Sequence, residues 1–355
     1  MKANLEPILD VLGTPDRCFR IPVFQRVYSW TERQCMQLLA DMQALMKEDG
    51  EETHFLGTLI YLPERSEAGP RYASLIDGQQ RLTTLTLLLI AMRDHLATSD
   101  KVEERGLAAQ IDETYLCDGD EVKLILSCDD AKALCHLVFG QNAFQAESPH
   151  AEGAQREPGS LKEDQAQSGF LLGNEALFAR MIDQEDIDCT CLLAALRRLT
   201  VIVVQLDDDD APQQVFESFN AKGKPLSTTD LLRNTLLLEH GFDEQARLFN
   251  IYWAPIDAAF EQFAPEDDIY LDAALHAWLA STAPDIKIGK RSDLYQAFKE
   301  YLATRDDAPE DLLRSISSAC LSFAKDPASP EAREHIDWVI DKPKGLVSER
   351  KLFGD

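Results

Sequence analysis

The residues with the clearest chemical potential form a pentad, Asp-Gly-Gln-Gln-Arg, between an apolar run and a long apolar helical pattern. Unpaired backbone N–H groups at the start of a helix carry partial positive charge, which suits a phosphate group. Gly78 permits close approach to the backbone, and Gln79 and Gln80 can both donate and accept hydrogen bonds. Arg81 offers a fork for phosphate oxygens, and Asp77 could bind Mg²⁺ or water. The alternative is a strand-to-helix turn in which Asp77 caps the helix and Arg81 pairs with a carboxylate.

A second cluster lies upstream of the pentad, in the segment Ile21–Trp30. Gln25, Arg26, Tyr28 and Trp30 bring hydrogen-bond donors and aromatic faces into six positions. Such a set can stack a nucleic-acid base and bind a phosphate group. The alternative is ordinary packing of an arginine and a tryptophan beside a short strand.

A third cluster follows a predicted helix that ends near residue 220. Lys222 and Lys224 surround Gly223 in a basic turn, close to the start of the next helix, and form a second candidate phosphate contact. Glu217 and Asn220 are three residues apart on one helix face. They could hold a metal-bound water or orient the loop.

The elements that must position these clusters follow from the apolar pattern. Strands are predicted at 19–21, 55–62, 72–76 and 199–206, and helices at 4–12, 32–46 and 82–97. A polar segment at about 145–169, rich in Glu, Pro and Gly, predicts a solvated insertion.

Beyond residue 212 the pattern is mainly helical. Ser227 begins a helix there, with Asp230 as the acid of a capping box. Four aromatic residues occupy positions that are expected to face a core: Trp253, Trp278, Phe298 and Tyr301.

Composition bounds the class of protein. The 355 residues are 45% hydrophobic and 27% charged, as in soluble globular proteins, and the formal net charge of −27 argues against indiscriminate coating of DNA or RNA. No apolar run reaches the length of a membrane helix, and the N-terminus lacks the plan of a signal peptide. Eight cysteines without a C-x-x-C pair favour free thiols over zinc or disulfides, so the expected location is cytoplasmic.

Taken together, the three clusters resemble the N-terminal domain family of the GmrSD-type restriction endonucleases in order and spacing. The matching segments are Ile21–Arg26 with Tyr28 and Trp30, Phe55–Thr58, Ile76–Leu85, Val215–Ser227 and Asp230–Asn234. The resemblance covers about residues 5 to 240. It implies an α+β fold, with a ParB/sulfiredoxin-like core around a small mixed sheet and a mainly helical region after it.

The resemblance also implies a function. In this family the pentad lies in a nucleotide-binding pocket, and members hydrolyse NTPs to regulate the cleavage of modified DNA in phage defence. The implied pocket consists of Asp77, Gly78, Gln79, Gln80 and Arg81, faced by Gln25 and Arg26 and closed by Glu217, Asn220, Lys222 and Gly223. The implied catalytic residues are Asp77, Gln80, Arg81 and Glu217, with Asp77 also as metal ligand. Mg²⁺ and the basic groups would stabilise phosphate charge while a carboxylate positions water.

The sequence departs from the family pattern in two places. Phe24 and Val27 stand where the family often has Tyr and Pro, which changes packing more than chemistry. Glu334–Ile336 resembles the start of the family's nuclease motif but lacks the rest of the metal site, so His335 is better explained as a histidine on a helix surface. A complete nuclease is therefore not expected within these residues.

We expect a nucleotide-binding domain at 1–240 and a helical region at 241–355, ending before a missing C-terminal nuclease domain. The leading hypothesis is an NTP-binding and NTP-hydrolysing regulatory module of a modification-dependent restriction system, with Mg²⁺ and an NTP of unknown base. A nuclease subunit or domain would cleave the DNA. One alternative is a metal-dependent nuclease that uses Asp77 and Glu217. Another is a non-enzymatic sensor of a nucleotide or of modified DNA.

Overall fold

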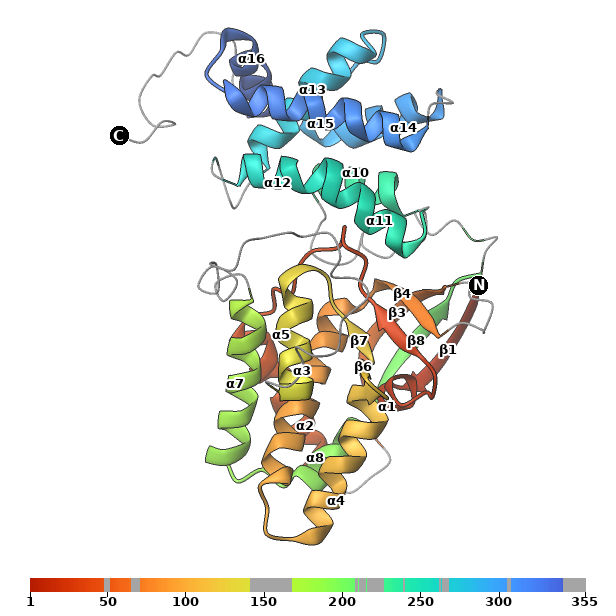
Figure 1. The fold of residues 1–355 in the computed structure, drawn as a ribbon, viewed down its shortest axis with the longest axis vertical. Coiled ribbons are helices and arrows are strands. Elements are labelled where there is room, and N and C mark those ends of the chain that lie inside the picture. Colours follow the sequence, from red (N-terminus) through yellow and green to blue (C-terminus); the bar gives the residue numbers. More distant parts are fainter. Residues whose placement is uncertain are drawn as a thin grey trace. The chain divides into compact units, whose positions relative to one another are not determined.

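The computed structural model describes residues 1–47, 52–64, 71–140, 168–207, 210, 215, 227–238, 240–261, 263, 268–304 and 308–340. The chain forms two compact units, Met1–Phe219 and Asn220–Asp355, both drawn in Figure 1. Across the described ranges, no helix combines the length and the apolar composition that a membrane crossing requires.

The first unit is built on a six-stranded mixed sheet with the strand order β1-β8-β3-β4-β2-β7. Its strands are β1 (Lys2–Pro7), β2 (Cys18–Arg20), β3 (His54–Pro63), β4 (Tyr72–Asp77), β7 (Leu124–Ile125) and β8 (Leu199–Gln205). β8 runs antiparallel to β1 and parallel to β3, and β3 and β4 are antiparallel. The α+β class and the four predicted strands are therefore confirmed. A separate two-stranded sheet joins β5 (Cys117–Asp118) and β6 (Glu121–Val122).

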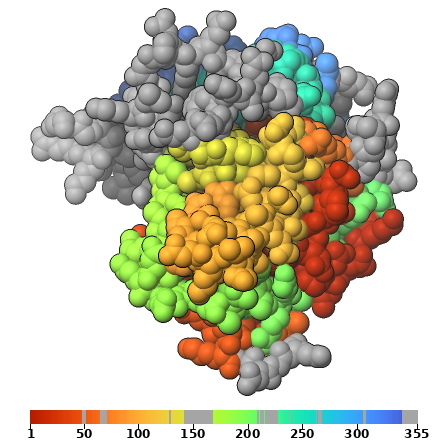
Figure 2. All heavy atoms as spheres, turned by 60° about the horizontal axis from the view of Figure 1, so that its bottom comes forward, coloured from red at the N-terminus to blue at the C-terminus, as the bar shows by residue number. Residues whose placement is uncertain are grey.

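Helices gather beside this sheet, as Figure 1 shows for α2, α3, α4 and α7. The helices of the unit are α1 (Ile8–Leu12), α2 (Glu32–Lys47), α3 (Gln79–Ala97), α4 (Val102–Ile111), α5 (Cys128–Phe139), α7 (Gly169–Gln184) and α8 (Cys189–Leu196). In α3 the unbroken run Leu82–Met92 is buried, so this helix is apolar on every side and lies in the core. In Figure 2 the orange and gold surface of the α3–α4 region lies beside the green segment that includes α7.

The N-terminal prediction was partly wrong. The segment 4–12 was expected to be one helix, but Lys2–Pro7 is a strand and the helix is confined to Ile8–Leu12. β1 pairs with β8 along its whole length, with Leu5 opposite Ile202. This long-range pairing satisfies the backbone groups of residues 2–7 that face β8 and overrides the local helical pattern.

The second unit is helical in its described part. Its helices are α10 (Thr228–Leu237), α11 (Phe242–Leu248), α12 (Ala254–Phe260), α13 (Ile269–Thr282), α14 (Leu294–Ala303), α15 (Pro309–Lys325) and α16 (Pro330–Val339), with a π-helical turn η3 (Phe249–Trp253). The predicted capping box of Ser227 and Asp230 is present at the start of α10. The four predicted core aromatics are buried, and the rings of Trp278 and Phe298 stack with centroids 5.4 Å apart.

His335 lies on α16, as predicted for a helix, but it is half-buried rather than on the surface. Its Nδ1 is 2.8 Å from Nδ1 of His276 on α13, and His276 stacks on the ring of Trp338. Burial, together with the facing His335, lowers the pKa of His276 to about 4. This histidine pair therefore fastens α16 to α13.

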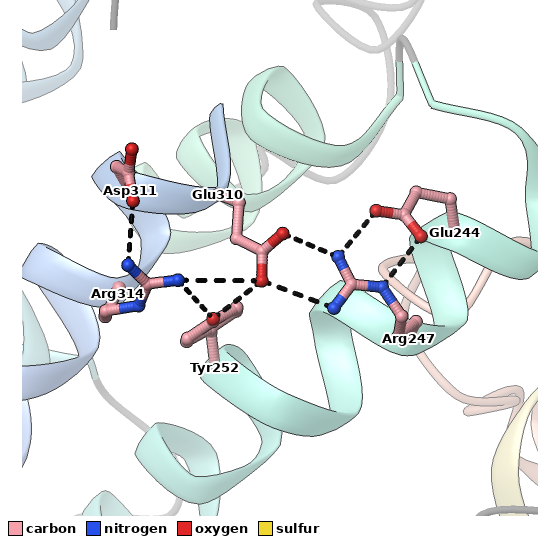
Figure 3. Close-up of polar contacts among 6 residues, drawn as sticks. All are labelled: Glu244, Arg247, Tyr252, Glu310, Asp311 and Arg314. Carbon is pink, nitrogen blue, oxygen red and sulfur yellow. Dashed lines mark hydrogen bonds and ion pairs between the residues drawn. The ribbon is translucent and has the colours of Figure 1, made fainter. Parts of the chain in front are cut away.

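A polar network on the surface of the second unit joins α11, η3 and α15 (Figure 3). Its members are Glu244, Arg247, Tyr252, Glu310, Asp311 and Arg314. Glu310 is the hub, because its carboxylate accepts hydrogen bonds from Arg247 and from the Tyr252 hydroxyl. These hydrogen bonds lower the pKa of Glu310 to about 2.

We expect Glu310→Gln to lower the Tm of the chain by about 1 to 3 °C at pH 7, because the network is exposed to solvent. The folded-state pKa of Glu310 is below its usual value of 4.5, so the charged form favours folding. This contribution is complete above about pH 4.5 and is lost as the pH falls towards 2. Scanning calorimetry at pH 7 and pH 3.5 should show the difference shrinking in acid. Glu331→Gln, at an exposed position, is the control, and an equal effect of both variants would contradict the prediction.

Candidate active site

The pentad forms a sharp strand-to-helix turn in the first unit. β4 ends at Asp77, and Gly78, with a backbone φ of 99°, is the N-cap residue before α3. A Cβ atom at Gly78 would lie 3.3 Å from both Leu59 Cδ1 and the carbonyl oxygen of Thr58. Glycine is therefore required here both for the left-handed conformation and for the close approach to β3.

Arg81 points back from α3 to β3. Its Nη1 donates to the carbonyl of Leu56 at 2.8 Å, and its Nη2 donates to the carbonyl of Thr58 at 2.7 Å. Nη2 also lies 3.3 Å from Oδ2 of Asp77. The guanidinium passes so close to Gly57 that any side chain there would overlap Nη1. Arg81 thus pairs with a carboxylate, as the alternative interpretation of the pentad predicted, and it also binds the bulged strand β3, which was not predicted. The predicted cap of α3 by the Asp77 side chain is not observed.

The two pentad glutamines bind the loop that contains the second cluster. Nε2 of Gln79 donates to the carbonyl of Arg26 at 2.8 Å. Oε1 of Gln80 accepts from the backbone N–H of Ser29 at 2.9 Å, and its Nε2 donates to the carbonyl of Val27 at 3.2 Å. Both side chains therefore hold the backbone of residues 26–29 against the first turn of α3.

Gln25 anchors the beginning of the same loop. Its side chain is 9% exposed, and its Nε2 donates to the carbonyls of Leu75 and Ile76 in β4. The predicted proximity of Gln25 and Arg26 to the pentad is therefore observed. The contacts are made by backbone groups and amide side chains.

Sequence reasoning missed three polar residues that support this loop. Asn174 on α7 donates to the carbonyl of Trp30 at 2.7 Å and to the Tyr28 hydroxyl at 3.0 Å. Thr84 lies 2.8 Å from the Tyr28 hydroxyl, and Asp130 on α5 accepts from the backbone N–H of Tyr28 at 3.2 Å. Asn174 and Tyr28 are 146 residues apart along the chain, so no local pattern indicated this contact.

A pocket opens where the loop, α3 and the start of α5 meet. Arg26, Gln79 and Gln80 line it, together with Ser127 and Asp130 and with apolar side chains. The space that these residues enclose is about 10 Å³, about the room that one water molecule needs. A phosphate group would therefore bind at the mouth of this pocket and not inside it.

Arg26 is the basic side chain that this arrangement leaves available. It is half-buried at the pocket, and the described residues give its guanidinium no hydrogen bond and no ion pair. The first turn of α3, beside it, has no side-chain cap. A free guanidinium next to an uncapped helix N-terminus can stabilise an anion.

The profile of the GmrSD restriction endonuclease N-terminal domain matches residues 8–237 of the chain. The chain belongs to this family. No match is found among curated proteins. The match to this family, written GmrSD_N below, extends from α1 to the last residue of α10. It therefore includes the pentad, the loop that carries Arg26 and the capping box at Ser227. Membership identifies the chain as a component of a restriction system, in a family whose DNA cleavage involves a partner or a fused nuclease domain.

Among the predicted GmrSD_N site residues, the structure places Arg26, Gln79 and Gln80 at one pocket. Asp77 and Arg81 form an ion pair with each other and belong to the strand-to-helix turn. Gln25 binds β4 and Gly78 forms the turn before α3. The other four predicted site residues lie outside the described residues: Glu217, Asn220, Lys222 and Gly223. Their roles stay predictions.

Asp77 is a poor fit for a metal ligand in this arrangement. Burial raises the pKa of its carboxyl group, against the opposing effects of the Arg81 charge and of the Gly78 N–H. One carboxylate oxygen already lies against the Arg81 guanidinium. Within the described ranges, no group of three or more His, Cys, Asp or Glu side chains is placed to hold a metal ion.

Proposed function

We propose that this GmrSD_N chain is a nucleotide-binding and nucleotide-hydrolysing regulatory module of a modification-dependent restriction system. DNA cleavage would be supplied by a partner subunit or a further domain. The observation that carries the proposal is the Arg26 guanidinium, which has no polar partner among the described residues and lies at a small pocket beside the uncapped first turn of α3. This combination favours a phosphate group, and family membership supplies the restriction context.

In this proposal the two arginines Arg26 and Arg81 have different roles. Arg26 would bind a phosphate of the NTP directly, whereas Arg81 would keep the turn and β3 in place. Mg²⁺ would arrive with the triphosphate as part of the substrate, since Asp77 is already paired with Arg81. The amides of Gln79 and Gln80 would hold Arg26 at the pocket through the loop backbone.

The experiment compares Arg26→Ala with wild type for binding and hydrolysis of ATP, GTP, CTP and UTP in the presence of Mg²⁺. We expect the variant to lose at least about tenfold in affinity, because a charge-assisted phosphate contact contributes about 1.5 to 3 kcal/mol. Its Tm should change by less than about 1 °C, since the guanidinium makes no hydrogen bond and no ion pair with the described residues. Arg197→Ala, which removes an exposed arginine of the same unit, is the charge-matched control.

Turnover or binding that is lost in Arg26→Ala and kept in Arg197→Ala supports the proposal. If calorimetry detects no binding of any of the four nucleotides to wild type, the proposal fails. DNA nicking by the purified chain with Mg²⁺ and without a nucleotide would instead support a nuclease.

A further inference from the structure

A buried polar hub lies behind the loop that carries Arg26. The hydroxyl of Tyr28, a residue that is 6% exposed, lies 2.8 Å from Thr84 Oγ1 and 3.0 Å from Asn174 Nδ2, and 3.6 Å from the sulfur of Cys35. Thr84 is fully buried and Asn174 is 1% exposed. Three polar groups from the loop, α3 and α7 thus meet in an apolar interior, where each needs a partner.

The chemistry of these groups fixes the direction of the hydrogen bonds that link Asn174, Tyr28 and Thr84. An amide nitrogen can only donate, so Asn174 donates to the Tyr28 oxygen. Thr84 uses its single hydroxyl hydrogen on the carbonyl of Gln80 at 2.8 Å, so it must accept from Tyr28. The result is a one-way chain that leads from Asn174 through Tyr28 and Thr84 to the backbone of Gln80.

Both ends of this chain return to the loop. At one end, the second hydrogen of the Asn174 amide binds the carbonyl of Trp30. At the other end, the Gln80 side chain binds the backbone of Val27 and Ser29. The loop is therefore closed into a hydrogen-bonded ring with the first turn of α3.

We infer that this one-way chain positions the Arg26 loop for phosphate binding, and that Asn174, Tyr28 and Thr84 are positioning residues of the site. The inference rests on the proposed function of Arg26. None of the three side chains needs to touch a ligand, because each acts through the loop backbone or through Gln80. Asp130 adds a fourth support through the backbone N–H of Tyr28.

Thr84 offers a matched pair of variants for the test. Thr84→Ser keeps the hydroxyl and therefore the series of hydrogen bonds. Thr84→Val keeps the shape of the side chain but interrupts the series of hydrogen bonds. Hydrogen exchange should be faster for the N–H groups of Tyr28 and Ser29 in the valine variant and unchanged in the serine variant. ATP affinity should fall about tenfold with valine only, because the Tyr28 hydroxyl loses its oxygen acceptor and keeps only the weak acceptor Cys35 Sγ at 3.6 Å. Combining Thr84→Val with Arg26→Ala should add little to the loss from Arg26→Ala alone.

Equal hydrogen-exchange rates of the Tyr28 and Ser29 N–H groups in the valine and serine variants would overturn the inference. So would affinity losses that are additive with Arg26→Ala, since Thr84 would then act independently of the loop. The two proposals can also fail separately. If wild type binds no nucleotide, but hydrogen exchange of the loop N–H groups is faster in Thr84→Val and unchanged in Thr84→Ser, the proposed function fails. The inference that these hydrogen bonds hold the loop in place then still stands.

Discussion

Replacing Arg81 with alanine is expected to destabilise the first unit by about 2 to 3 kcal/mol, or about 5 to 10 °C in Tm. The guanidinium is 25% exposed and holds two carbonyls of β3 and the carboxylate of Asp77. Its removal takes one donor from each of these three acceptors, and burial already disfavours the charged form of Asp77, which would keep only the Gly78 N–H. Thermal unfolding followed by scanning calorimetry measures the loss.

The pH dependence of the Arg81→Ala variant provides a second check. Without the arginine, the pKa of Asp77 should rise further above its usual value. The protonated carboxyl is then favoured in the folded state, so the variant should regain part of its lost stability as the pH falls through this pKa. Arg81→Lys, which keeps the charge but not the fork, should be intermediate. Unchanged Tm together with abolished nucleotide binding would instead identify Arg81 as a ligand-binding residue.

We expect Gly57→Ala to lower the free energy of unfolding of the first unit by a similar amount. Gly57 has a φ of 111°, where an L-residue is strained by about 1 to 2 kcal/mol, and the new methyl group would overlap Arg81 Nη1. Displacing the guanidinium also weakens its bonds to β3, so we expect about 3 kcal/mol in total. Denaturant unfolding of the variant measures this change.

Gly119→Ala is the matched control for Gly57→Ala. Gly119 also has a positive φ, of 64°, but a Cβ atom there would meet nothing within 4 Å. This variant should therefore show only the backbone strain. In the double variant Gly57→Ala/Arg81→Ala, the loss should be clearly smaller than the sum of the two single losses, because the overlap no longer exists. Additive losses would show that the guanidinium is not what excludes a side chain at Gly57.

Much of the fold could be predicted because the decisive signals are local. β3, β4 and β8 are short apolar runs bounded by polar segments, and α3 is too apolar to be a surface helix. The capping box of α10 depends on two residues only three positions apart. β1 could not be predicted, because its partner strand lies about 200 residues further along the chain, as Lys2 opposite Gln205 shows.

The location of the candidate site could be predicted from the sequence, but the roles of its individual residues could not. Residue types alone cannot tell a glutamine that binds a ligand from one that binds a neighbouring backbone, and Gln79 and Gln80 do the latter. Arg81 and Arg26 have the same chemistry, yet only Arg81 faces carbonyls that a glycine at 57 leaves accessible. Nothing in the sequence indicated the role of Asn174, because its contact with the loop forms only when α7 packs beside the loop.

The place of β8 between β1 and β3 has a consequence for biosynthesis. β8 is an interior strand of the sheet, yet it is the last strand of the sheet to leave the ribosome. Until then, β3 and β1 have no neighbour on the side that β8 will occupy, and contacts of such long sequence separation form slowly. The nascent chain would therefore expose open strand edges until β8 has emerged, and such edges favour aggregation or binding by chaperones. Shortened versions for expression should extend beyond Gln205.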